Sequence, residues 1–160
     1  MVKVKICGLT NQADYNLACQ LGADYAGFVF YRKSLRFIEP ELARKLVRQA
    51  KYQAIKVGVF VNEQASIIRE IYDYVGLDIV QLQGDEEPDF CRQLGLPYWK
   101  AIRAKDTSDV EKLKKFPGDI FLLDSFSGVA YGGTGKQLAR SLLREALKTG
   151  KKIVVAGGLS

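Results

Sequence analysis

Seven short apolar segments alternate with six longer amphipathic segments along this chain of 160 residues. The apolar segments are rich in β-branched and aromatic residues, as strands buried in a parallel sheet are. They are Val2–Cys7, Tyr25–Phe30, Ile55–Val61, Ile79–Leu82, Tyr98–Ile102, Ile120–Asp124 and Ile153–Ala156. The amphipathic segments are Asn11–Leu21, Pro40–Ala50, Glu63–Val75, Glu86–Leu94, Ser108–Lys115 and Gln137–Lys148. Strict alternation predicts repeated strand–helix–strand units in a single α/β domain over residues 1–160.

Local signals support the helices. Asn11 and Ser108 stand at positions where N-caps are expected, and Pro40 stands at an expected first turn. Glycines follow the last periodic residue of four of the predicted helices, as C-terminal caps do. They are Gly22, Gly76, Gly95 and Gly150.

A chain of this kind forms either an open doubly wound sheet or a closed barrel. The open sheet with a dinucleotide site carries a GxGxxG fingerprint after its first strand, whereas this chain has Cys7-Gly8-Leu9-Thr10 there. A barrel needs eight strands, and the seventh predicted strand is the last. The barrel alternative therefore implies an incomplete barrel.

The chain contains no histidine, which excludes a Ser-His-Asp triad, a Cys-His pair and an HExxH zinc site. Proton transfer then falls to Asp, Glu, Lys, Tyr or Cys. The three cysteines, Cys7, Cys19 and Cys91, lie far apart and fit neither a metal pair nor a disulfide framework. This pattern predicts a reducing, cytoplasmic location.

The net charge leaves three kinds of partner open: nucleic acid, acidic surfaces and small anions. The formal net charge is +6, but the basic residues are spread along the chain, which is more typical of solvated helix faces than of a nucleic-acid surface. No apolar run approaches the length of a membrane span. We therefore expect neither nucleic acid nor membrane as a partner.

Residues able to carry chemistry follow the predicted strands, and ligands of parallel α/β folds bind at the carboxyl ends of strands. Cys7 and Asp124 end their strands, and Arg36 lies in a basic loop after the second. Gly157 and Gly158 would let backbone N–H groups approach a phosphate. Each residue also has a purely structural alternative. Cys7 could be a small buried thiol and Asp124 a cap of the following loop. Arg36 could be an ordinary surface charge, and the two glycines a plain turn.

The glycine-rich loop at residues 131–136 is no Walker A motif, because Ala130 and Gln137 stand where that motif needs Gly and Ser or Thr. We interpret it as a lid over Asp124, with Gly132, Gly133 and Gly135 giving the hinge.

A series of short motifs extends in order over almost the whole chain. They are Lys5-Ile6-Cys7-Gly8-Leu9-Thr10, Gly22-Ala23-Asp24, Gly27-Phe28-Val29-Phe30, Ser34-Leu35-Arg36, Val57-Gly58-Val59-Phe60-Val61-Asn62, Val80-Gln81-Leu82, Leu122-Leu123-Asp124, Tyr131-Gly132-Gly133-Thr134-Gly135 and Ala156-Gly157-Gly158-Leu159. With these motifs the chain resembles the phosphoribosylanthranilate isomerases of tryptophan biosynthesis, and its opening residues match the KICG[IL]T signature of that family.

The resemblance implies a (βα)8 TIM barrel that performs an Amadori rearrangement of a small phosphorylated, carboxylated substrate without metal or organic cofactor. It implies that Asp124 is the general acid that opens the ribose ring and that Cys7 is the general base. Arg36 would hold the anthranilate carboxylate, and Gly157 and Gly158 the phosphate. Lys5, which alternates with Ile6, is expected not to reach the thiol and receives no role.

Two departures from the family pattern stand out. Gln83 replaces a histidine that is usual there, and we expect this change to lie outside the proton relay. Family members run to roughly 200 residues, so helix seven, strand eight and helix eight are expected to be absent. The unpaired edges would favour self-association, or complementation by the missing segment. Two alternatives stay open: a barrel fragment without turnover, and another phosphosugar isomerase or a synthase of the same pathway.

Overall fold

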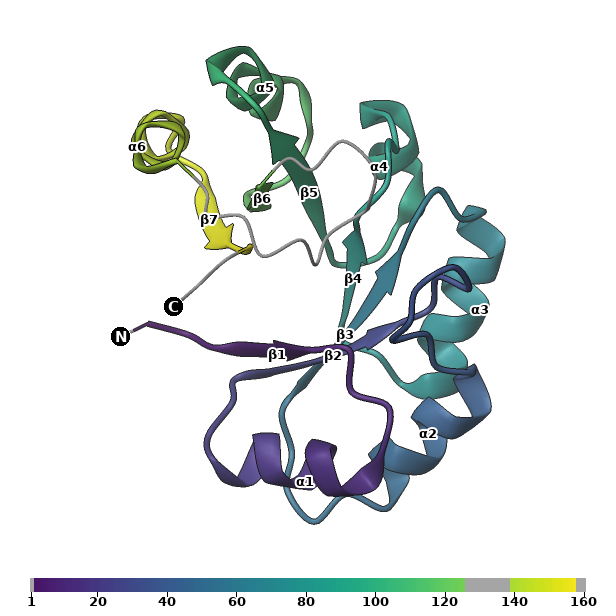
Figure 1. Cartoon of the computed structure of the whole chain (residues 1–160). Coiled ribbons are helices and arrows are strands. Elements are labelled where there is room, and N and C mark those ends of the chain that lie inside the picture. Colours follow the sequence, from purple (N-terminus) through teal and green to yellow (C-terminus); the bar gives the residue numbers. More distant parts are fainter. Residues whose placement is uncertain (1, 126–138, 158–160) are drawn as a thin grey trace. The chain divides into compact units, whose positions relative to one another are not determined.

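A computed structural model describes residues 2–125 and 139–157. The chain divides into two compact units, Met1–Gln81 and Leu82–Ser160. Each unit contains strands accompanied by helices, which Figure 1 labels in chain order. Within the described residues, no helix is long and apolar enough to cross a membrane.

The strands of the first unit follow one another in the order β1-β2-β3-β4. The pairs β1–β2 and β2–β3 are parallel, with Cys7 opposite Gly27 and Gly27 opposite Val57. Residues alternate between the two faces of a strand, so this register fixes which side chains lie beside Cys7. The elements are β1 (Lys5–Cys7), α1 (Gln12–Gln20), β2 (Tyr25–Val29), α2 (Pro40–Arg48), β3 (Ile55–Phe60), α3 (Ala65–Val75) and β4 (Ile79–Leu82), whose last residue opens the second unit.

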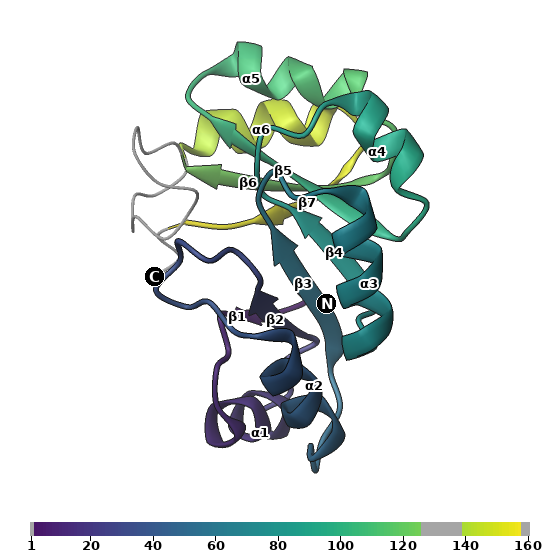
Figure 2. The same ribbon diagram turned by 90° about the vertical axis from the view of Figure 1, so that its right-hand side faces the viewer.

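The second unit places β5, β6 and β7 side by side, all parallel. Its elements are α4 (Pro88–Leu94), β5 (Tyr98–Ala104), α5 (Thr107–Glu111), a 3₁₀ helix (Lys112–Lys115), β6 (Ile120–Ser125), α6 (Arg140–Lys148) and β7 (Lys152–Val155). Figure 2 shows α5 and α6 lying together against these strands. The core between them includes Phe121, Leu123, Leu113 and Leu142, which burial removes from water.

The predicted alternation of strands and helices is confirmed, and the differences lie at element ends. The first strand begins at Lys5 rather than Val2. Asn11 caps α1 as predicted, accepting a hydrogen bond from the Asp14 N–H. Ser108 does not cap α5. Asp106, two residues before Ser108, is the N-cap, and its side chain accepts a hydrogen bond from the Ser108 N–H. Aspartate and serine are about equally favourable at this position.

The fourth helix also begins later than predicted, at Pro88 instead of Glu86. Glu86 is almost completely buried in an ion pair with Lys100, so it belongs to the loop before the helix. Proline at the first helical position then fixes the start, because its missing N–H needs no partner there.

An apolar face is exposed on β1 and α1. A hollow of about 520 Å³ lies there, lined by residues that include Val4, Ile6, Leu17 and Leu21. Each of these four side chains is exposed, and apolar surface of this kind favours association. Self-association of the chain stays a prediction.

Candidate active site

Cys7 ends β1 and its thiol lies within reach of Lys5. The Lys5 Nζ donates hydrogen bonds to Cys7 Sγ at 3.1 Å and to Gln81 Oε1 at 2.7 Å. The expectation that Lys5 does not reach the thiol is therefore wrong. Ile6 does face away, but residues two apart on a strand share one face, which puts Lys5 and Cys7 together.

Two glycines make room for this arrangement. A Cβ atom on Gly27, opposite Cys7 on β2, would lie 2.9 Å from Cys7 Sγ and 3.0 Å from Lys5 Cε. Gly8 has a φ of +84°, which L side chains rarely adopt, and a Cβ there would lie 2.5 Å from Arg36 Cδ. The backbone positions next to the thiol, at Gly8 and Gly27, thus carry no side chain.

Arg36 reaches the same end of β1 from the loop after β2. Its Nη1 donates to the Cys7 carbonyl oxygen at 3.1 Å, and its backbone N–H donates to Ser34 Oγ at 3.1 Å. The side chain is otherwise exposed to solvent. The structure therefore brings together two of the predicted site residues, Cys7 and Arg36.

Asp124 lies on β6 of the second unit and is buried, with 5% of its surface exposed. Gln83, equally buried, donates from Nε2 to Asp124 Oδ2 at 3.0 Å. A buried carboxyl group is costly without such a partner. Where the family pattern has histidine, this chain thus supplies an amide N–H to the predicted acid.

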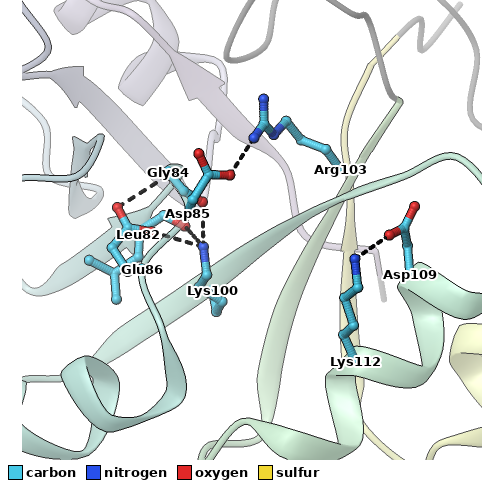
Figure 3. A network of polar contacts seen from close by, with 8 residues as sticks. All are labelled: Leu82, Gly84, Asp85, Glu86, Lys100, Arg103, Asp109 and Lys112. Atoms are coloured by element: carbon cyan, nitrogen blue, oxygen red, sulfur yellow. Dashed lines mark hydrogen bonds and ion pairs between the residues drawn. The ribbon is translucent and has the colours of Figure 1, made fainter.

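Beside Gln83 lies a buried ion pair that the sequence did not reveal. Lys100 on β5 and Glu86 each expose 2% of their side chains, and Lys100 Nζ lies 2.8 Å from Glu86 Oε2. The same Nζ donates to the carbonyl oxygens of Gly84 at 2.7 Å and Leu82 at 3.4 Å, and Glu86 Oε1 accepts the Gly84 N–H at 3.1 Å (Figure 3). A lysine inside an apolar strand was the available signal, because buried charges are normally paired.

A cavity of about 450 Å³ adjoins this pair within the second unit. Arg103 of β5 forms an ion pair with Asp85, which lies in the loop after β4 (Figure 3). Lys112 and Asp109, which also line the cavity, form a second ion pair. Each of these charged groups thus has an opposite charge beside it, and Lys105, Lys115 and Glu87 also line the cavity.

The predicted phosphate and lid residues are only partly described. Gly157 follows β7 with a φ of +86°, a conformation that glycine adopts readily. Gly158, Gly132, Gly133 and Gly135 lie outside the described residues. In residues 2–125 and 139–157, no group of three or more Cys, Asp or Glu side chains is arranged to hold a metal ion.

The other two cysteines are packing residues. Cys19 on α1 and Cys91 on α4 are buried. Burial raises the pKa of the Cys19 thiol, and it raises the pKa of the Cys91 thiol to about 11. Both are therefore protonated near neutral pH.

Iodoacetamide near neutral pH is expected to modify Cys7 alone in the native protein. The thiolate is the reactive form, and burial keeps Cys19 and Cys91 as thiols. Peptide mass spectrometry checks the site, with Cys7→Ser as the unlabelled control and the denatured chain as the fully labelled one. Native labelling of Cys91 at a similar rate would contradict the packing role.

Comparison with known proteins decides the family. The model of the N-(5′-phosphoribosyl)anthranilate (PRA) isomerase family matches residues 4–160. The chain belongs to this family. The PRA isomerase of Trichlorobacter lovleyi is 41% identical over 160 residues, which cover all of this chain and 78% of that protein.

Solved PRA isomerases have the same fold. The crystal structure of the Thermus thermophilus enzyme superposes with a TM-score of 0.89 at 31% identity, covering 99% of this chain and 78% of that one. A PRA isomerase in complex with reduced 1-(o-carboxyphenylamino)-1-deoxyribulose 5-phosphate gives a TM-score of 0.83 at 36% identity, covering 99% and 77%. The α/β fold and the family are confirmed. The expectation of a truncated barrel is not confirmed by these comparisons.

Proposed function

We propose that this chain is a (βα)8-barrel-type isomerase that converts N-(5′-phosphoribosyl)anthranilate into 1-(2-carboxyphenylamino)-1-deoxyribulose 5-phosphate. Its membership of the PRA isomerase family over residues 4–160 carries the proposal. A relative of the same fold binds a reduced form of the product, which is a small phosphorylated and carboxylated compound.

The reaction needs one proton donor and one base. Asp124 would protonate the ribose ring oxygen while the C1′–O bond breaks and the anthranilate nitrogen forms a Schiff base. Cys7, as thiolate, would then remove the C2′ proton, and the electron pair moves to the nitrogen to give an enolamine that tautomerises to the ketone. A carboxyl group and a thiolate can perform both transfers in a chain without histidine.

The neighbours of Cys7 support its role as the base. The Lys5 ammonium donates a hydrogen bond to Sγ, which fixes the sulfur at the end of β1. Lys5 is fixed in turn by Gln81, whose Oε1 accepts its second hydrogen bond. Lys5 thus enters the proposed site as the residue that holds the base.

Two groups would bind the ends of the substrate. Arg36 presents a guanidinium beside Cys7, suited to the planar anthranilate carboxylate. Gly157 and Gly158, which follow β7 in the sequence, would offer N–H groups to the phosphate. The net charge of +6 fits an anionic substrate.

A turnover assay tests the proposal. N-(5′-phosphoribosyl)anthranilate is supplied to the chain, loss of its fluorescence gives the rate, and NMR identifies the ketone of the product. The Cys7→Ser/Asp124→Asn double variant is the matched control. A folded chain that leaves the substrate unchanged would contradict the proposal and favour a barrel unit without turnover.

Arg36→Met is expected to raise KM with little change in thermal stability. The substitution keeps most of the stem and removes a charge-assisted contact worth about 1.5–3 kcal/mol, or about 10–100-fold in KM. Steady-state kinetics measure the change. Arg32→Met is the control, because Arg32 lies in the same loop but is exposed and paired with Glu39. An unchanged KM would return Arg36 to the role of a surface charge.

A further inference from the structure

The loop after β4 is fastened on both sides of Gln83. Lys100 Nζ donates to the carbonyl oxygens of Leu82 and Gly84, which precede and follow Gln83. Glu86 accepts hydrogen bonds from the Gly84 N–H and from Lys100 Nζ (Figure 3). Lys100 and Glu86 together form a clamp on this loop. Both charged side chains are 2% exposed, so water competes little for these contacts.

The side chain of Gln83 links this fixed loop to Asp124. Its Nε2 donates to Asp124 Oδ2 at 3.0 Å, and both residues are 5% exposed. An amide N–H can only donate, so Oδ2 is the acceptor of this bond. The hydrogen bond therefore holds the carboxyl group in one orientation on β6.

The strand register places the anchor and the acid on adjacent hydrogen-bonded strands. Asp124 on β6 pairs with Arg103 on β5, and Lys100 lies three residues earlier on β5, so the Lys100 and Asp124 side chains lie on opposite faces of the sheet. Lys100 holds the backbone of the loop from one face, and the Gln83 side chain reaches Asp124 on the other. A shift of the loop would move the Gln83 amide relative to a carboxyl group held by β6.

We propose that Lys100 and Glu86 are positioning residues for Asp124 and act through Gln83. The inference rests on the role of Asp124 as general acid in the proposed function. Neither Lys100 nor Glu86 moves a proton of the substrate. They keep the amide aimed at Oδ2, as supporting residues hold a catalytic group in productive geometry.

The test replaces the ion pair as a whole, by Lys100→Met/Glu86→Met. Removing one partner would leave an uncompensated buried charge, whereas exchanging both for apolar side chains of similar volume commonly keeps the fold. We expect a thermal midpoint close to that of the unaltered chain. We also expect kcat to fall about 10–100-fold, with KM little changed, because misplaced catalytic groups lose rate rather than binding.

A double-mutant cycle with Gln83→Met tests the route. If the clamp acts through Gln83, Gln83→Met alone lowers kcat by a similar factor, and adding the clamp substitutions lowers it little further. The ¹H–¹⁵N signal of the Gln83 side-chain amide, identified by its loss in Gln83→Met, gives a readout that needs no turnover. We expect this signal to move in Lys100→Met/Glu86→Met.

The matched control is Lys112→Met. Lys112 lines the same cavity, and its ion pair is with Asp109 of the preceding α5 rather than with the loop of Gln83. Wild-type kcat in a stable Gln83→Met variant, or an unmoved Gln83 amide in the clamp variant, would overturn the inference. Full turnover in Asp124→Asn would instead refute the proposed acid, and the amide signal would still report on the clamp.

Discussion

Asp124→Asn is expected to lower turnover by about 10²–10⁴-fold, the usual contribution of a general acid. Asparagine has the same shape but no proton to deliver to the ring oxygen. Its side-chain oxygen can still accept the Gln83 N–H that now reaches Oδ2, so the buried contact is preserved. The loss should therefore appear in kcat, measured on protein whose unfolding midpoint is close to that of the unaltered chain.

Replacement of a second buried polar residue, Gln81, is the comparison for Asp124→Asn. Gln81 lies on β4, and its Oε1 bonds Lys5 rather than Asp124. Gln81→Met should affect turnover less than Asp124→Asn. Turnover near the wild-type level in folded Asp124→Asn protein would show that another group opens the ring.

Cys7→Ser is expected to abolish most turnover and to leave the fold intact. Serine fits the space left by Gly27 and can accept the Lys5 hydrogen bond, but its hydroxyl is a far poorer base than a thiolate. The expected loss is about 10²–10⁴-fold in kcat, measured under saturating substrate. Binding through Arg36 should persist, so KM should change little.

Cys19→Ala is the control for the choice of thiol. Cys19 is buried in α1, so its truncation leaves a small cavity and lowers stability. The rate per folded molecule should be retained. If Cys19→Ala stopped the reaction in stable protein while Cys7→Ser did not, the base would be misassigned.

The periodicity of the sequence was sufficient for the alternation of strands and helices, because each strand and helix is decided by nearby residues. Ile79–Leu82 is reproduced to the residue, and the other segments differ by a few residues at their ends. Those ends depend on caps, and Asp106 and Ser108 are both good N-cap residues. Pattern alone does not choose between them.

The site was predictable only in part, because its contacts join distant segments. Cys7, Arg36 and Asp124 could be proposed from strand ends and family motifs. The Lys5–Gln81 contact joins residues 76 apart, and no local pattern contains it. Glu86 and Lys100 were read as a helix residue and a strand residue because sequence does not tell a buried, paired charge from an exposed one.

Gly27 limits which substitutions the surroundings of Cys7 can accept during evolution. It contributes no donor, acceptor or charge, yet the volume beside the Cys7 sulfur exists because β2 carries no side chain there. Any larger residue must displace either the sulfur or the Lys5 stem, and backbone neighbours leave little freedom to do so. In descendants of this chain we therefore expect glycine to be retained at position 27 as long as the Cys7 sulfur and the Lys5 stem lie against it.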